Sequence, residues 1–472
     1  MRRLIATLLI VCILQTVAVG QKGPQKKKYA PPPVDAPAEY RSADAAQSGA
    51  QALADAKWFE VFRDEKLQDL IRDALAHNYD VRAAVARIDA ARAAVGVTRS
   101  EQLPSVGAGG DLTHERRSRD GAFTIPEPIS QHRTFGSMVT NLFTYEVDAW
   151  GRLRTQTFAA RADLAASEEA RRAVLTTVVG DVSTSYFSLR ELDFELEIAR
   201  RTLASRQESL RLIKLRQERG VSNMLEVRQA EELVYNATEV IPAVEQSIEQ
   251  QENFISLLTG RSPRAVPRGE SLTEQQAPPE VPAGLPSDLI ERRPDILSAE
   301  QELVAASARI DVAKKAYFPR ISLTGFLGFE STSLVSLFSP SRAVWGFLPQ
   351  VSQPIFTGGR IKSEVRFTQA QRKFLLVNYE RTIQNAFREV ADSLVARRKS
   401  REVRAQRELL VTTLRDRSRL AYLRYNGGVS NLLEALDADR ELFDAELSVA
   451  QARRDELLSV VQLYKALGGG WQ

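Results

Sequence analysis

Two acidic residues, Glu434 and Asp437, are spaced so that their carboxylates could act together. They lie three positions apart in a segment without Gly or Pro, so one helix would present both carboxylates on one face, where they could attract or repel cations. Most acidic pairs at this spacing simply face solvent. The three histidines, His77, His114 and His132, are scattered, and the sequence has no phosphate-binding Gly loop, nucleophile elbow or metal-ligand cluster. We therefore expect no enzyme activity, no cofactor and no metal site.

The acidic pair lies just beyond a very long predicted helix. No Gly or Pro occurs at positions 361–426, and a helix of that length would measure roughly 100 Å. Gly427-Gly428 ends this segment, and a second segment without Gly or Pro returns over 431–467. Its apolar residues recur every three or four positions, which is typical of a coiled-coil seam that would run from Leu433 to Tyr464. We therefore predict two long antiparallel helices joined by a Gly turn.

The same hairpin occurs twice in the chain. Gly151-Arg152 matches Gly359-Arg360, and Gly220-Val221-Ser222 matches Gly428-Val429-Ser430, each pair lying 208 positions apart. A repeat of about 200 residues is much longer than the periods of solenoid proteins, so we expect two copies of one architectural unit. Pro242 falls in the returning helix of the first copy, where its missing N–H should kink or interrupt that helix.

Four segments upstream of the long helices alternate between apolar and polar residues, as half-buried strands do. They cover residues 106–115, 135–147, 320–330 and 345–356, although Pro349 and Pro354 fit poorly in the last of them. Each has the length of a membrane-spanning strand, but two ordinary soluble hairpins would have the same pattern. Four strands cannot close a transmembrane barrel, and open strand edges are not tolerated in lipid. Strands that span a membrane would therefore require several chains to share one barrel.

The N-terminal region indicates export. Residues 1–20 combine Arg2-Arg3, an apolar core and a small-residue cleavage site, which predicts a signal peptide. Cys12 lies inside that core next to the bulky Val11, so we do not expect lipidation there, and the mature chain would hold no cysteine. Residues 21–57 predict an extended arm. The mature chain has 62 basic and 60 acidic residues, a balance that does not favour nucleic-acid binding.

A set of short motifs, in a fixed order and with the duplication described above, covers the chain from Trp58 to Leu467. They are Trp58, Phe62, Asp64, Leu67, Leu70-Ile71, Ala74-Leu75 and Asn78, then residues 289–296 with Ala299-Glu300, then residues 318–323, and then residues 356–360. Together they resemble the TolC family of trimeric outer-membrane efflux channels, most closely its OprM/NodT-like branch. Relatives in that branch commonly carry a lipidated cysteine at the cleavage site, from which this chain departs.

The resemblance implies a mainly helical fold with a small β part. Three chains would close a twelve-stranded barrel in the outer membrane, and their coiled-coil hairpins would form a tunnel in the periplasm. The implied organisation is a first repeat over residues 58–260, with strands at about 105–148 and a hairpin at 152–258. A Pro-rich equatorial connection over 261–293 follows. The second repeat would cover 294–468, with strands at about 320–356 and a hairpin at 361–467.

The resemblance also implies where the tunnel closes. The positions that match the periplasmic gate of the family are Tyr425, Glu434 and Asp437. Three-fold symmetry would turn the two acids into rings that repel one another when closed and favour cations when open. The first hairpin has Glu226 opposite Glu434 but Gln229 opposite Asp437, which fits one hairpin moving more than the other. The tips Gly220-Val221-Ser222 and Gly428-Val429-Ser430 would dock a periplasmic adaptor, although Gly also ends helices for purely structural reasons.

We therefore expect an outer-membrane exit channel that exports small molecules. It would contact outer-membrane lipid and work with an adaptor protein and an inner-membrane pump of the resistance–nodulation–division type. One alternative keeps the fold but serves type I protein secretion with an ATP-binding-cassette exporter. A second is a coiled-coil scaffold in the periplasm that forms no channel. A third, a passive porin, is hard to reconcile with two hairpins of roughly 100 Å.

Overall fold

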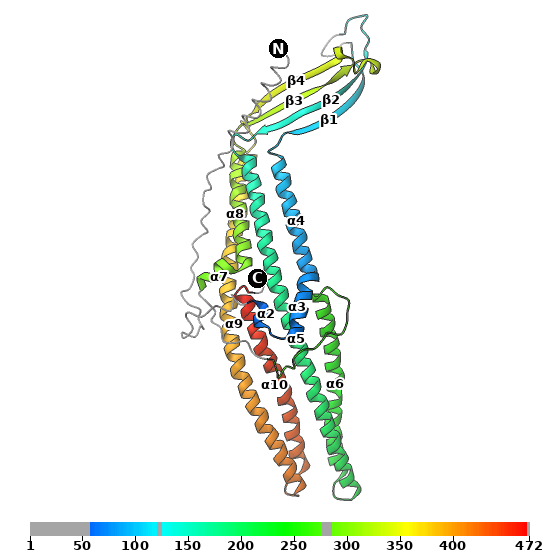
Figure 1. Ribbon diagram of the computed structural model, residues 1–472, viewed down its shortest axis with the longest axis vertical. Coiled ribbons are helices and arrows are strands. Elements are labelled where there is room, and N and C mark those ends of the chain that lie inside the picture. The colour runs from blue at the N-terminus through cyan, green and yellow to red at the C-terminus, as the bar shows by residue number, and fades with distance from the viewer. Residues whose placement is uncertain (1–56, 120–124, 276–285, 470–472) are drawn as a thin grey trace. The chain divides into compact units, whose positions relative to one another are not determined.

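The computed structural model describes residues 57–119, 125–275 and 286–469 (Figure 1). The expected signal peptide, Cys12 and nearly all of the expected arm lie outside the described residues. The chain divides into two compact units. In its described part, the first unit contains Asp89–Ala166 and Glu300–Asn378, and the second contains Ser167–Ala299, residues 57–88 and the chain from Tyr379 onward.

The first unit contains a four-stranded antiparallel sheet in the order β1-β2-β3-β4 (Figure 1). The strands are β1 (Ser105–Arg116), β2 (His132–Val147), β3 (Arg320–Ser331) and β4 (Ala343–Ser352). Two short 3₁₀ helices, η2 (Leu334–Ser336) and η3 (Pro340–Arg342), lie between β3 and β4. Within this sheet β1 and β4 each have one neighbour, so each has one unpaired edge. The predicted mainly helical fold with a small antiparallel sheet is confirmed.

Strand β4 is shorter than the alternating pattern predicts. It ends at Ser352, so Pro354 lies beyond it, whereas Pro349 lies inside it opposite Leu323. An edge strand tolerates a proline because the missing N–H can face the unpaired side. The large apolar side chains of β4 are exposed in the single chain, among them Trp345 and Val351.

The helical part begins with α2 (Trp58–Val61), α3 (Glu65–His77) and α4 (Tyr79–Ser100). The first long hairpin consists of α5 (Arg152–Glu218) and α6 (Met224–Leu258). After α7 (Pro286–Arg292) and α8 (Pro294–Lys315), the second long hairpin consists of α9 (Arg360–Asn426) and α10 (Leu432–Ala466). Both α5 and α9 contain 67 residues, and both α6 and α10 contain 35. Among the helices of the described residues, none has the length and apolar character needed to cross a membrane.

Helix α6 continues without a break through Pro242, so the expected interruption is wrong. A proline removes one backbone hydrogen bond from a helix, and the packing of a long hairpin can outweigh that loss. Ile241 beside it packs with Val240 against a cluster that includes Ile198 and Phe443. The apolar contacts of the two residues just before the proline therefore help to hold the helix together.

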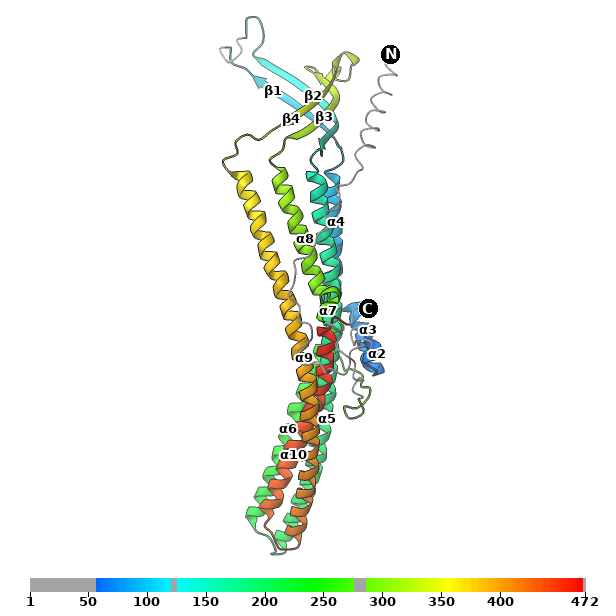
Figure 2. The same ribbon diagram turned by 90° about the vertical axis from the view of Figure 1, so that its left-hand side faces the viewer.

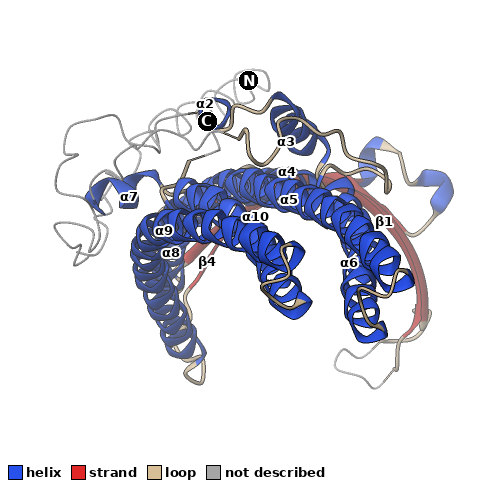
Figure 3. Ribbon diagram, turned by 90° about the horizontal axis from the view of Figure 1, so that it is seen from below, coloured by secondary structure: helices blue, strands red, loops and turns tan. Residues whose placement is uncertain are grey.

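Helices α5 and α9 begin in the first unit, and in the second unit they lie side by side with α6 and α10. Figures 1 and 2 show α6 alongside α5 and α10 alongside α9. Seen from below, α10 lies between α9 and α5 (Figure 3). Ion pairs connect α10 to both neighbours, and the carboxylate of Glu446 accepts from Arg415 of α9 at 2.8 Å and from Arg201 of α5 at 2.7 Å. The two hairpins therefore meet along α5 and α10, and we call this contact the seam between the hairpins.

Candidate gate and docking site at the hairpin tips

Both hairpins turn through the same backbone structure. Gly220 and Gly428 have φ angles of 74° and 75°, a left-handed conformation that side chains with a Cβ rarely adopt. The next amide in each turn bonds back to the helix, from Val221 N to Arg216 O at 2.9 Å and from Val429 N to Arg424 O at 3.0 Å. This arrangement satisfies the last carbonyl groups of α5 and α9. The turn chemistry of the two tips is therefore sufficient to explain both glycines.

The helices that return from the tips are also capped in the same way. The side chain of Asn223 accepts from the amide of Glu226 at 3.0 Å, and the side chain of Asn431 accepts from the amide of Glu434 at 3.1 Å. Ser430 donates its hydroxyl to the Glu434 carboxylate, as Ser222 does to Glu226. Glu434 therefore has a structural role at the start of α10, whatever else it does.

Tyr425 occupies the contact between the two tips. Its side chain, which comes from α9, is buried among apolar residues of the other three long helices: Ile213, Val227, Ala230, Leu233, Leu432 and Leu436. Its hydroxyl donates to the Glu226 carboxylate of the other hairpin at 3.2 Å. The guanidinium of Arg216 lies 4.6 Å from the centre of its ring. Burial raises the pKa of the Tyr425 phenol, the nearby Glu226 raises it further, and Arg216 opposes both effects. The phenol therefore remains a hydrogen-bond donor at neutral pH.

The two candidate gate acids lie apart from Tyr425 and are half-exposed. The Glu434 carboxylate lies 3.4 Å from the guanidinium of Arg424, and the Asp437 carboxylate lies 3.3 Å from that of Arg440. Their side chains keep 43% and 42% of their exposure. Exposed ion pairs of this kind contribute little to stability. Both carboxylates can therefore exchange these partners for other charges. The structure thus places a buried contact at Tyr425 and a solvated acidic surface on the first turns of α10.

Large apolar side chains are exposed around both tips. Val221 and Val429 keep 68% and 73% of their surface, and Met224, Leu225 and Leu433 are exposed as well. The expected position of Leu433 on the coiled-coil seam is wrong, because Leu432 is buried in its place. The Asn431 cap sets the phase of α10 and turns Leu432 and Leu436 toward Tyr425. Exposed apolar groups beside a polar turn are typical of protein-binding surfaces.

Sequence reasoning missed the partners of the gate tyrosine. The sequence relates Glu226 only to its counterpart Glu434 and gives no indication of Arg216. Both contacts join residues about 200 positions apart, so no local pattern could reveal them. The only available signal was the duplication, because it predicts that the two tips lie close together.

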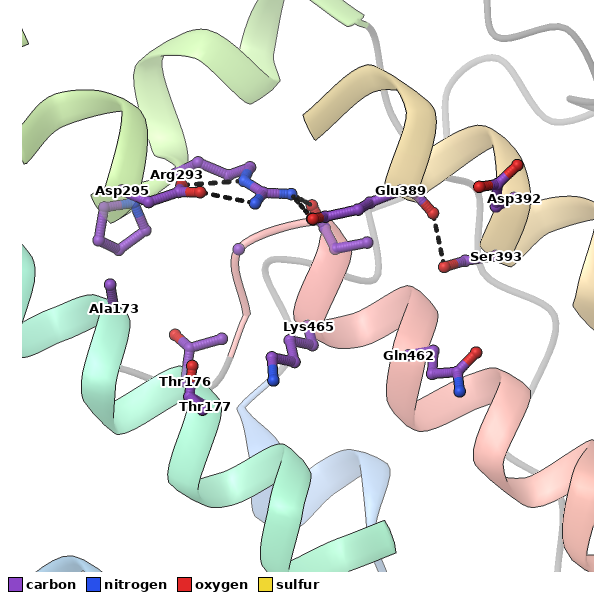
Figure 4. Close-up of a pocket in the computed structure, with 13 residues that line it drawn as sticks. Ala173, Thr176, Thr177, Arg293, Asp295, Glu389, Asp392, Ser393, Gln462 and Lys465 are labelled. Atoms are coloured by element: carbon purple, nitrogen blue, oxygen red, sulfur yellow. Dashed lines mark hydrogen bonds and ion pairs between the residues drawn. The ribbon is translucent and has the colours of Figure 1, made fainter. Parts of the chain in front are cut away.

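A cavity of about 370 Å³ lies within the second unit, where α8 begins and α10 ends (Figure 4). The buried guanidinium of Arg293 borders it and bonds to Asp295 at 2.7 Å, to Glu389 at 2.8 Å and to the Ala466 carbonyl at 2.9 Å. All of these partners belong to the protein itself, so Arg293 joins α8, α9 and α10 rather than presenting a charge to a ligand. Asn78 makes the matching contact in the first hairpin by donating to the Leu258 carbonyl at 2.8 Å.

The model of the outer membrane efflux protein family matches residues 70–261 and 285–469 of this chain. The chain belongs to the outer membrane efflux protein family. The members of this family are transport components of the outer membrane, and this chain is therefore an outer-membrane protein. Among its relatives is the toluene efflux pump outer membrane protein TtgF of Pseudomonas putida, 39% identical over 421 residues, which are 89% of this chain and 86% of that protein. The probable outer membrane lipoprotein SilC of Salmonella typhimurium is 32% identical over 446 residues, which are 94% of this chain and 95% of SilC.

Solved structures of outer-membrane channels have the same fold as this family member. The open state of the MtrE outer membrane channel of Neisseria gonorrhoeae aligns with a TM-score of 0.83 and 30% sequence identity, covering 94% of this chain and 98% of MtrE. A membrane protein from Pseudomonas aeruginosa aligns with a TM-score of 0.85 and 32% identity, covering 93% of this chain and 99% of that protein.

Proposed function

We propose that this chain is the outer-membrane exit channel of an efflux pump and that it exports small molecules from the periplasm. The observation that carries the proposal is the pairing of a four-stranded sheet with two 67-residue helices in a member of the outer membrane efflux protein family. A scaffold or a passive porin would need only one of these two parts. The channel has no enzyme activity of its own and draws its energy from a partner pump.

The open edges of the sheet support a shared barrel. Edge strands β1 and β4 each leave one row of backbone N–H and C=O groups without a partner in the sheet. Lipid cannot satisfy such groups, so these edges pair with other copies of the chain. Three copies supply twelve strands, whereas four strands are too few to close a transmembrane barrel. The equal lengths of α5 and α9, and of α6 and α10, support the internal duplication and the boundaries inferred from it.

The class of cargo is inferred from the names of the relatives. TtgF and the SrpC protein of Pseudomonas putida are named for efflux of toluene and of solvents. We infer that this channel also serves small-molecule efflux, with a periplasmic adaptor and an inner-membrane pump of the resistance–nodulation–division type. Type I protein secretion is the second candidate, and no observation on this chain favours it.

The tips would perform two tasks. The exposed Val221 and Val429, together with the turn residues Gly220, Ser222, Gly428 and Ser430, would dock the adaptor. Tyr425 would hold the hairpins together through Glu226, and Glu434 and Asp437 would form acidic rings in the trimer. Rings of carboxylates favour cations in an open pore and repel one another when they approach.

Photo-crosslinking from position 431 in living cells tests this function, because Asn431 caps the second tip beside the exposed Val429. Capture of the adaptor of a resistance–nodulation–division pump is the expected result. Capture of an adaptor of an ATP-binding-cassette exporter would move the function to protein secretion. A matched crosslinker at position 235, where Tyr235 is exposed farther along α6, should capture less adaptor. Equal capture at both positions would contradict docking at the tips.

A further inference from the structure

Arg206 of α5 is a charged side chain buried in the seam between the hairpins. Its side chain keeps only 4% of its exposure, and its guanidinium donates to the Asp439 carboxylate of α10 at 2.8 Å. A second nitrogen of the same group donates to the Leu233 carbonyl of α6 at 3.1 Å. One side chain thus connects α5 and α6 of the first hairpin to α10 of the second.

This guanidinium is buried, and one of its nitrogen atoms lacks a hydrogen-bond partner. Its Nη2 atom is buried and has no hydrogen-bond partner. The Phe443 ring lies 4.9 Å away. Burial, together with the neighbouring Asp439 carboxylate, raises the pKa of the Tyr422 phenol of α9 to about 12, although Arg206 opposes this shift. A buried donor without a partner destabilises the state in which it is buried and gains hydration when that state opens.

The duplication provides an internal comparison for the pair. The residue 208 positions after Arg206 is Leu414, which is buried in an apolar cluster. The residue 208 positions before Asp439 is Glu231, whose partners Lys214 and Arg228 lie at 2.9 and 2.6 Å and are themselves exposed. The same architectural position therefore takes an apolar residue in one copy and a buried charge in the other. Packing alone does not require an arginine there.

We propose that the Arg206–Asp439 pair sets the balance between the closed and the open arrangement of the two hairpins. With the hairpins packed together as in the structure, which we call the closed arrangement, the pair is buried, and one donor of Arg206 is unsatisfied. When the hairpins separate, water reaches both charges and hydrates them. The pair therefore holds the seam together through its direct contact but limits how stable the closed seam can become. This role rests on the proposed function, because it concerns the opening of the same channel.

Two changes to the pair should have opposite effects. Asp439→Asn leaves the guanidinium buried without its counter-ion, which disfavours the closed seam strongly. Replacing both residues by leucine removes both charges and fills the space with apolar groups, and such replacements of buried ion pairs are often neutral or stabilising. If the pair only stabilised the contact between the hairpins, the result would differ. The single substitution and the double substitution would then both loosen the seam.

The rate of thiol labelling at a Leu210→Cys substitution tests the proposal in the full-length protein in detergent. Leu210 packs against the apolar cluster around Tyr425, and the mature chain should contain no other cysteine. We expect Asp439→Asn to speed labelling by about tenfold or more, and the double leucine variant to label no faster than the parent. The control Glu231→Gln, at the matching position of α6, should leave the rate within about twofold of the parent.

Labelling accelerated in both Arg206/Asp439 variants, or in neither, would overturn the proposal. An Asp439→Asn variant that fails to fold would lose the trimer on a native gel. In that case Arg206→Leu provides the second single substitution, because it leaves the Asp439 carboxylate without its counter-ion. This variant should also be labelled faster than the double leucine variant. The labelling rate does not depend on conduction or on an adaptor, so failure of the channel function and failure of this proposal give separate results.

Discussion

The two helical hairpins share their turns but not the residues that meet between them. Their helices match in length, and both tips combine a left-handed glycine, an asparagine cap and a serine–glutamate contact. These shared features are what a long hairpin needs in order to turn and restart a helix. Folding is therefore sufficient to explain the common part of the tips, whereas a function that only one hairpin performs must depend on the positions where the hairpins differ.

Four of the matching positions that differ in chemistry lie at the tips or in the contact between the hairpins. Tyr425, Asp437, Arg206 and Glu191 have Gln217, Gln229, Leu414 and Lys399 as their counterparts 208 positions away. Tyr425 and Arg206 each contact the other hairpin, and Glu191 does so through Arg454. Part of the asymmetry between the hairpins therefore lies where the hairpins meet. It indicates that the contact between hairpins, rather than either hairpin alone, is adjusted for function.

The largest effect should come from the shared feature. Gly428→Val and Gly220→Val each force a β-branched residue to adopt a positive φ, which costs about 2 kcal/mol. No atom would clash with the added Cβ at either position, so the two costs should be equal. Hydrogen exchange at the tips should rise similarly in both variants, and efflux should fall while the trimer persists. Unequal exchange would show that the turns differ, and normal efflux would remove them from adaptor docking.

The next effect concerns pH and tests the difference between Glu191 and its counterpart Lys399. The Glu191 side chain is 5% exposed and lies 3.2 Å from Arg454. Burial and the neighbouring Glu195 carboxylate together raise the pKa of Glu191 from 4.5 to about 7, although Arg454 opposes both effects. The folded protein thus favours the protonated acid. The contribution of Glu191 to stability is fully present below pH 4.5 and is lost as the pH rises through about 7.

Glu191→Gln should remove this pH dependence, which amounts to roughly 2 kcal/mol between pH 5 and pH 8. Thermal unfolding midpoints of parent and variant at pH 5 and pH 8 provide the measurement. Lys399→Gln is the matched control, because Lys399 forms an exposed pair with Glu402. A Glu191→Gln protein that keeps the pH dependence of the parent would show that another group causes it.

A smaller effect should follow from the hydroxyl of Tyr425. Tyr425→Phe keeps the ring in the apolar cluster and removes one hydrogen bond to a partly solvated carboxylate, at a cost of about 1 kcal/mol. Hydrogen exchange in residues 425–436 should accelerate about fivefold. Gln217→Leu at the matching position of the first hairpin should leave exchange near that turn unchanged. Equal acceleration in both variants would contradict a special role for Tyr425.

Much of the helical structure could be predicted from the sequence because it depends on local chemistry. Long runs without Gly or Pro, ended by glycine turns, predict both hairpins, and positive φ angles at Gly220 and Gly428 agree with that interpretation. The phase of α10 was misjudged at Leu433, because the pattern cannot show which of two adjacent leucines the Asn431 cap turns inward. Pro242 was given too much weight for the same kind of reason, because tertiary packing can outweigh a local preference.

The candidate site was predicted only in part. Tyr425, Glu434 and Asp437 came from a family resemblance, whereas Glu226 and Arg206 became visible once the helices were placed side by side. A buried arginine cannot be recognised in a helix that also carries many exposed arginines. What decides its role is the residue opposite, and that residue lies 233 positions away.

Single-channel recording of the purified protein in a planar bilayer tests most directly the claim that this is a channel closed by its second hairpin. Wild type should conduct weakly and prefer cations. Replacing both Glu434 and Asp437 with alanine should raise the conductance and weaken the preference for cations, whereas Gln229→Ala in the first hairpin should change neither quantity. Unchanged conductance and selectivity in the double variant, or an equal change in both proteins, would contradict the account.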